Sequence, residues 1–183
     1  SPPFEMSAAG SVEEFQCEAQ QDVDDVCVGY SSGAKAAVQV KRTVSLSDAL
    51  DSGLSKTVGQ FVKQYLRYQR ESPPGHSVDP LSRRLVLAVS PAAPATIRTV
   101  LRSLLQAVAT MPSERPLDPR NEDEKKALEV ITVVIQRHWQ EATGSPAQGQ
   151  DIRDLLRLIR VVELDVDPAG RDESVAEDLL RQA

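Results

Sequence analysis

Alternating apolar and polar residues in the first quarter of the chain predict three β-strands. The alternation covers residues 14–19, 25–30 and 36–43, and a period of two residues is typical of a half-buried strand. Residues 31–34 are Ser, Ser, Gly and Ala, which favour a hairpin turn between the second and third segments. We therefore expect three sequential strands in a meander.

Helical spacing of apolar residues follows, from Leu54 to Leu66, and either Asp51 or Ser52 can cap this helix. A loop is expected at residues 72–76, which include two prolines and a glycine. The continuous apolar run at residues 85–89 predicts a strand that is buried on both faces.

The second half of the chain is predicted to be mostly helical. Three helices are expected at residues 97–108, 121–144 and 151–159, followed by a strand at 161–166 and a terminal helix at 172–182. The predicted fold class is mixed α/β, with a helical insertion at about residues 95–160. We expect one domain over residues 1–183, with its core at about 11–94 and 161–183, within a larger protein.

The composition agrees with a folded domain, because 40% of the 183 residues are hydrophobic and 26% are charged. The two cysteines, Cys17 and Cys27, form no CxxC pair, so a zinc site or a disulfide scaffold is not expected. No apolar run is long enough to span a membrane, and residues 1–5 do not resemble a signal peptide. These features predict a reduced, cytoplasmic protein that does not contact a membrane.

The net charge of −6 is unevenly distributed along the chain. Residues 1–34 carry seven acidic and no basic side chains, whereas residues 35–84 carry nine basic and four acidic ones. A uniformly basic nucleic-acid binder is excluded, but an acidic cluster beside basic residues suits a cation site that handles phosphate. Scattered, solvated surface charge is the alternative interpretation.

The predicted hairpin brings three polar residues together. Gln39 and Lys41 share one face of their strand, with Cα atoms roughly 7 Å apart. We favour a register that pairs Val26 with Val40, because it gathers the branched apolar residues on one buried face and leaves Gln39 and Lys41 on the polar face. This register sets Asp25 opposite Lys41.

A shift of two residues would set Asp25 opposite Gln39 and still match the faces. In the favoured register, Cys27 lies opposite Gln39 instead. In both registers Asp25 lies near Gln39 and Lys41, and Asp24 points to the other face.

This trio suits metal-assisted chemistry on a phosphate. A carboxylate and an amide oxygen can hold Mg²⁺, and the Lys41 ammonium can stabilise charge that develops during attack. Glu18 on the neighbouring strand is the candidate for a second carboxylate. The alternative is a cross-strand salt bridge between Asp25 and Lys41 without any catalytic role.

An acidic residue that opens one strand, followed by Gln-x-Lys on the next, resembles the PD-(D/E)XK, or restriction-endonuclease-like, superfamily, with Gln39 in place of its usual acidic residue. Residues 18–26 and 38–43 are similar to the double-stranded-DNA nuclease domains at the N-terminus of bacterial anti-phage proteins, including CBASS effectors and STAND NTPases. Residues 60–62 and 85–90 continue this similarity.

The resemblance implies a restriction-endonuclease-like mixed sheet flanked by helices, and an Mg²⁺-dependent DNA endonuclease, with Mn²⁺ as an alternative cation. It assigns catalysis to Asp25, Gln39 and Lys41, and metal binding to Asp25, Gln39 and Glu18. Double-stranded DNA is the expected partner, and self-association is expected through the parent protein. The candidate contacts to nucleic acid are Arg42, Lys56, Gln60 and Lys63.

One feature departs from the family pattern. The fold normally begins with a helix that packs on the sheet, and the residues before Ser11 leave no room for it. We expect that segment to be missing or the site to be incomplete. A catalytically silent domain of the same fold, serving assembly or nucleic-acid binding, is the alternative function.

Overall fold

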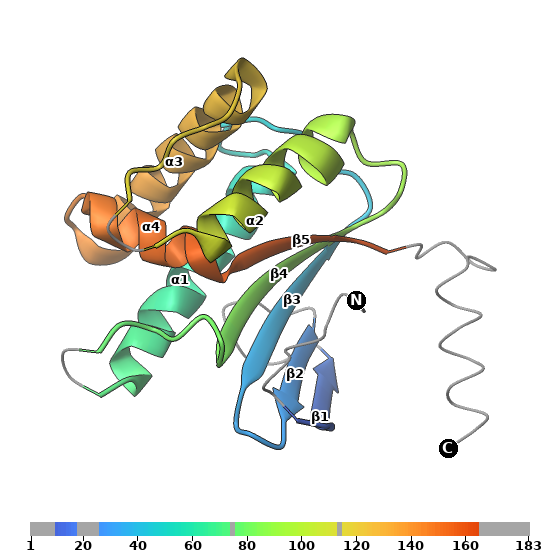
Figure 1. Cartoon of the computed structure of the whole chain (residues 1–183), viewed down its shortest axis with the longest axis vertical. Coiled ribbons are helices and arrows are strands. Elements are labelled where there is room, and N and C mark those ends of the chain that lie inside the picture. The colour runs from blue at the N-terminus through green and yellow to red at the C-terminus, as the bar shows by residue number, and fades with distance from the viewer. Residues whose placement is uncertain (1–9, 18–25, 74–75, 113–114, 165–183) are drawn as a thin grey trace.

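The computed structural model describes residues 10–17, 26–73, 76–112 and 115–164. Within these residues, five strands form one sheet in the order β1-β2-β3-β4-β5 (Figure 1). The strands are β1 (Val12–Cys17), β2 (Val26–Tyr30), β3 (Lys35–Lys41), β4 (Arg83–Val89) and β5 (Ile159–Glu163). The first three strands pair antiparallel, which confirms the predicted meander, and β3, β4 and β5 pair parallel.

The described part of the chain also forms four α-helices. They are α1 (Gly53–Glu71), α2 (Arg102–Thr110), α3 (Glu122–Thr143) and α4 (Gly149–Leu158), and a π-helical segment, η1 (Thr96–Leu101), precedes α2. Apart from α1, these helices lie between β4 and β5, where a helical insertion was predicted. None of the helices in the described ranges combines the length and the hydropathy that a bilayer-spanning segment needs.

The ends of two helices are set by side chains that the sequence indicates. The Ser52 side chain caps α1 by accepting a hydrogen bond from the backbone N–H of Ser55 at 3.1 Å. Asn121 caps α3 in the same way, and Gly144 ends that helix with a φ of 76°, a conformation that glycine adopts without strain. The last predicted helix, at residues 172–182, lies outside the described residues.

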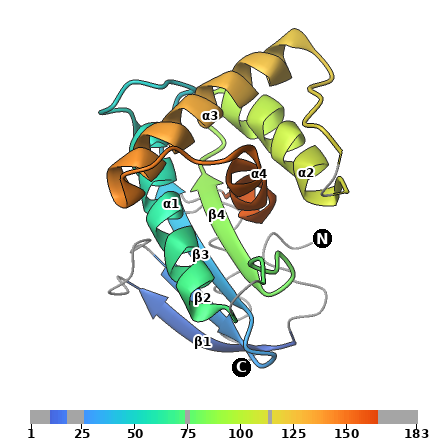
Figure 2. The same cartoon turned by 90° about the vertical axis from the view of Figure 1, so that its left-hand side faces the viewer.

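The helices cover one face of the sheet. Both parallel connections, β3 to β4 and β4 to β5, step in the same direction across the sheet, and such crossovers are right-handed. Their helices therefore lie on the same face, as Figures 1 and 2 show, and α1 crosses in front of β3 in Figure 2. We call this the helix-covered face, and the opposite side of the sheet the open face.

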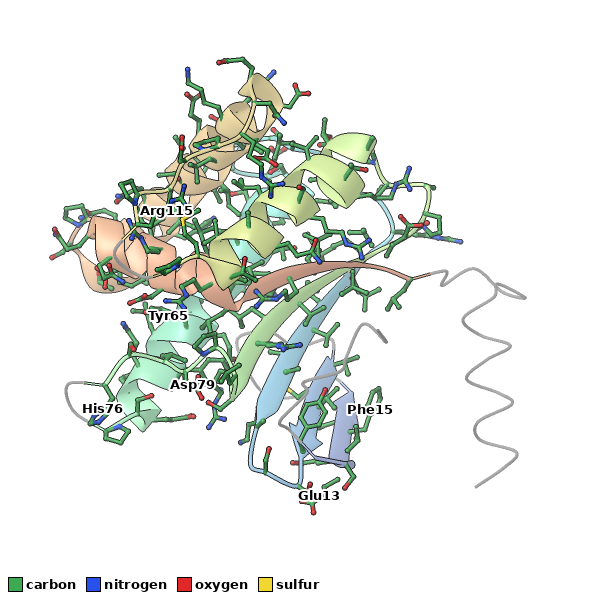
Figure 3. The ribbon with its side chains drawn as sticks, viewed as in Figure 1. Glu13, Phe15, Tyr65, His76, Asp79 and Arg115 are labelled. Carbon is green, nitrogen blue, oxygen red and sulfur yellow. The ribbon has the colours of Figure 1, made fainter. Side chains whose placement is uncertain are left out.

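The main core lies between the helix-covered face and the helices. The sheet contributes the side chains of Ala37, Leu85, Leu87, Val89, Ile159 and Val161 to this core. In the helix layer, the rings of Tyr65 on α1 and Trp139 on α3 lie with their centroids 5.8 Å apart. Figure 3 shows Tyr65 in this layer. The sheet and the helices thus share one core that supports β3 from one side.

Candidate functional site

Gln39 and Lys41 lie on β3, the central strand of the sheet, and both project toward the helix-covered face. Gln39 is 1% exposed, and Lys41 is half-buried at the carboxyl end of the strand. The expectation that both face a polar surface is wrong for Gln39. The reason is that the helices cover the face of β3 that carries Gln39, whereas the valines of β3 lie on the opposite, open face.

The observed hairpin register corrects the favoured prediction. Val26 pairs with Val38 rather than with Val40, and Cys27 lies opposite Ala37 rather than opposite Gln39. The alternative, shifted by two residues, is the register that forms.

The turn explains this register. The N–H of Tyr30 donates to the carbonyl of Ala34 at 3.0 Å, which closes a loop of three residues. Gly33 ends this loop with a φ of 79°, and three-residue hairpin loops commonly place a residue of this conformation there. Because the turn makes Tyr30 and Ala34 partners, every later pair along the hairpin follows from it.

Two of the predicted site residues, Asp25 and Glu18, lie outside the described residues. In the sequence, Asp25 immediately precedes Val26, the first residue of β2. Cys27, one residue further, packs against the core on the helix-covered face. Burial raises the pKa of the Cys27 thiol, an effect that the charge of Lys35 partly offsets, and a raised pKa disfavours the thiolate form.

A carboxylate that the sequence analysis did not single out lies in line with Lys41. The register aligns Lys41 with Val89 on β4, and Val89 with Glu163 on β5. At the usual strand spacing, the Cα atoms of Lys41 and Glu163 are roughly 10 Å apart. Arg98 of η1 binds the Glu163 carboxylate at 2.9 Å.

This row lies at the carboxyl ends of three parallel strands, the edge at which α/β sheets bind ligands. Arg98 and Glu163 are 65 positions apart in the sequence, so no local pattern indicates that they form a pair. Among the described residues, no group of three or more His, Cys, Asp or Glu side chains is placed to hold a metal ion.

The proposed nucleic-acid contacts of α1 form one stripe along the helix. Lys56 and Lys63 are exposed. Gln60, which lies between them, and Arg67, which follows Lys63, are half-buried. The stripe continues to the exposed Arg70, because positions 4, 7, 11 and 14 residues apart return to the same side of a helix. Its length from Lys56 to Arg70 is about 21 Å at the helical rise per residue.

Lys63 and Arg70 also line a shallow depression of 580 Å³ between α1 and the end of α3. Arg42, the remaining predicted contact, is exposed and directly follows β3. The structure therefore gives the predicted basic side chains of α1 a common surface. It places Arg42 at the end of the strand that carries Gln39 and Lys41.

A serine, a histidine and a glutamate form a chain of hydrogen bonds that sequence analysis missed. The Ser55 hydroxyl on α1 lies 3.0 Å from Nε2 of His138 on α3, and Nδ1 of this histidine lies 2.9 Å from the Glu141 carboxylate. A carboxylate only accepts hydrogen bonds, so Nδ1 donates to Glu141. In the neutral ring, Nε2 then accepts from the serine.

This order of groups matches that of a serine hydrolase, but Ser55 is 0% exposed, so no substrate can reach its hydroxyl. The chain of bonds is a bridge between α1 and α3. His76, the other histidine, is exposed in its loop.

Gly59 lies directly against the ring of His138. A Cβ atom at Gly59 would lie 3.0 Å from Cε1 and Nδ1 of His138. We expect Gly59→Ala to displace the ring and to lower the free energy of unfolding by about 1–3 kcal/mol. The helix propensity of alanine, which is roughly 1 kcal/mol better than that of glycine, offsets part of the cost of displacing the ring. Urea unfolding followed by circular dichroism measures the change.

The matched control is the same substitution in a His138→Ala background. Without the ring, the propensity of alanine dominates, and Gly59→Ala should raise the free energy of unfolding there. An equal change in both backgrounds would show that the histidine does not require the glycine.

Comparison with known proteins identified no relative of this chain. No protein-family model matches the sequence, and neither the curated proteins nor the solved structures gave a match. The interpretation of the site therefore rests on its own residues and their placement.

Proposed function

We propose that this chain is a restriction-endonuclease-like nuclease domain that cleaves double-stranded DNA with the help of Mg²⁺ or Mn²⁺. One observation carries the proposal. Gln39 and Lys41 project from the same face of β3, just beyond Val38, which pairs with Val26 at the start of β2. Asp25 is the residue before Val26 in the sequence, so the acidic residue directly precedes the strand that pairs with the one carrying the Gln-x-Lys pattern.

The donor set suits a hard divalent cation. The Asp25 carboxylate and the Gln39 amide oxygen are oxygen ligands of the kind that Mg²⁺ takes together with water and phosphate oxygens. A cation bound by these two residues would supply Lewis-acid chemistry, that is, it would polarise the phosphate and make a bound water more acidic. The Lys41 ammonium would offset negative charge that develops on the phosphate oxygens.

The basic stripe of α1 supports a nucleic-acid substrate. Lys56, Lys63 and Arg70 give it three cationic groups along about 21 Å, comparable to about six nucleotides of one strand of B-DNA. Contacts of this kind recognise the backbone rather than the base sequence. We therefore expect cleavage with little sequence preference and with strong inhibition by salt.

The burial of Gln39 favours a second candidate function. A ligand residue that is only 1% exposed is held away from solvent, as expected of a core amide in a catalytically silent domain of the same fold. Such a domain would use the basic stripe of α1 for binding or assembly without cleavage.

Incubation of the protein with supercoiled plasmid in Mg²⁺ decides between the two functions. The proposal expects conversion to nicked and linear DNA in Mg²⁺ or Mn²⁺, and full loss of this conversion when EDTA removes the cation. Retarded but intact plasmid in a gel would support the silent binding domain. Cleavage that continues in EDTA would contradict the metal-dependent mechanism.

A further inference from the structure

The open face of the sheet carries an apolar surface that is separate from the main core. Val38, Val86, Ala88 and Val162 form a cluster of buried side chains there, and the partly buried Val26, Val40 and Leu164 pack against it. Beside this cluster lies a groove of 340 Å³, and all the described side chains that line it are apolar. None of the described helices lies on this side (Figures 1 and 2).

This surface is unlike the outside of an ordinary sheet. Phe15 and Val12 at the edge of the groove are 65% and 57% exposed. Figure 3 shows Phe15 projecting from β1 on the side away from α1. Parallel strands such as β3, β4 and β5 are normally covered on both faces. A covering element with an apolar side is therefore expected here.

The chain itself runs into this groove. Leu164, the residue after β5, lines the groove and donates its N–H to the carbonyl of Val89 at 2.9 Å. The segment after it, residues 165–183, lies outside the described residues. In that segment, residues 172–182 have apolar side chains at helical spacing, namely Val175, Ala176, Leu179 and Leu180.

The dimensions of this segment match those of the open face. Residues 165–171 contain Pro168 and Gly170, which favour a turn, and they can span about 23 Å when extended. A helix over residues 172–182 would be about 16 Å long. Five strands at the usual spacing are about 19 Å wide, so such a helix can reach and cover the groove.

Charge complementarity also favours this occupant. Arg84 and Arg160 lie on the open face, in register with Ala36 and Val86. Burial and the positive charges of Arg84 and Arg157 lower the pKa of Arg160 to about 10, which reflects the positive charge gathered on this part of the sheet. Residues 165–183 carry six acidic and two basic side chains.

We propose that residues 172–182 form an amphipathic helix that docks on the open face of the same chain. Its Val175, Leu179 and Leu180 fill the valine-lined groove, and its acidic side chains lie toward Arg84 and Arg160. The helix would complete a three-layer arrangement, with the sheet between two helical layers.

Methyl chemical shifts of the full chain test this docking. The variant Leu179→Asp with Leu180→Asp places two charges on the apolar side of the segment. We expect it to move the methyl resonances of Val38, Val86 and Val162 and to raise the fluorescence of the apolar dye ANS several-fold. The resonances of Leu87 on the helix-covered face should keep their positions, which shows that the fold persists.

The matched control, Ser174→Asp with Gln182→Asp, adds the same charge on the polar side of the segment and should leave all these signals unchanged. A milder variant, Leu180→Ala, should move the same open-face resonances by a smaller amount. Unchanged open-face methyls in the Leu179→Asp, Leu180→Asp variant would overturn the proposal.

Sedimentation of the wild-type chain distinguishes docking of its own residues 172–182 from coverage of the open face by a second copy of the chain. Intramolecular docking requires a monomer at micromolar concentration. A dimer that persists in the Leu179→Asp, Leu180→Asp variant, together with unchanged open-face methyl resonances, would mean that a second copy covers the face. A dimer that dissociates in this variant would mean that the segment docks on a partner chain, and both results would overturn the proposal.

Discussion

Lys41→Ala should lower the rate of Mg²⁺-dependent plasmid cleavage at least about 100-fold, the usual cost of removing a group that stabilises charge in a transition state. The substitution should leave the unfolding midpoint nearly unchanged. Lys41 is half-buried at the end of β3, and no salt bridge of its side chain is seen among the described residues. Initial cleavage rates and urea unfolding of the same preparations measure the two effects.

Lys35→Ala is the control for this prediction. Lys35 begins the same strand, projects from the same face and is exposed, but it lies six residues away, about 20 Å along the strand. Both variants remove one positive charge, so a general electrostatic effect on DNA binding would lower both rates alike. Equal rates for Lys41→Ala and the wild type would exclude Lys41 from the active site.

Asp25→Asn should abolish metal-dependent cleavage, with a loss of at least about 100-fold, whereas Asp24→Asn should keep most of the activity. The side chains of a strand alternate between its faces. Cys27 lies on the helix-covered face with Gln39. From the alternation in the sequence we therefore expect Asp25 to share the face of Gln39 and Asp24 to belong to the other face. Cleavage rates over a titration of Mg²⁺ compare the two variants at equal charge.

If the Asp25→Asn variant loses less cleavage activity at high Mg²⁺ than at low Mg²⁺, Asp25 contributes to the affinity for Mg²⁺. The reverse ranking, with Asp24→Asn inactive and Asp25→Asn active, would show that an irregularity before β2 exchanges the two faces. In that case the hairpin would still carry the site, but with the other carboxylate.

Much of the local structure follows from short-range signals that the sequence contains. Ser52 and Asn121 begin their helices because each accepts a backbone hydrogen bond within its own first turn. Gly144 ends α3 because few other residues adopt its backbone conformation without strain. These effects act over three or four residues, so no knowledge of the rest of the chain is needed to predict them.

The register of the β2–β3 hairpin depends both on the hydrophobic alternation of its strands and on the turn that joins them. Hydrophobic alternation allows two registers that differ by two residues, because both keep the same side chains on the same face. Gly33 was the signal that could have decided between them, since a glycine at the end of a three-residue loop makes Tyr30 and Ala34 partners. The favoured register gave more weight to pairing valines than to the chemistry of the turn.

The meander, the polar pair Gln39 and Lys41 on one side of β3, and the order of strands and helices can all be predicted from the sequence, because each depends on periodicity or on a neighbouring residue. Which face of the sheet the helices cover, and hence the burial of Gln39, follows only from the packing of the helices on the sheet. This packing also places Arg98 against Glu163, and Ser55 against His138. Contacts between residues 65 and 83 positions apart depend on how the parallel crossovers fold over the sheet, and no local pattern specifies that geometry.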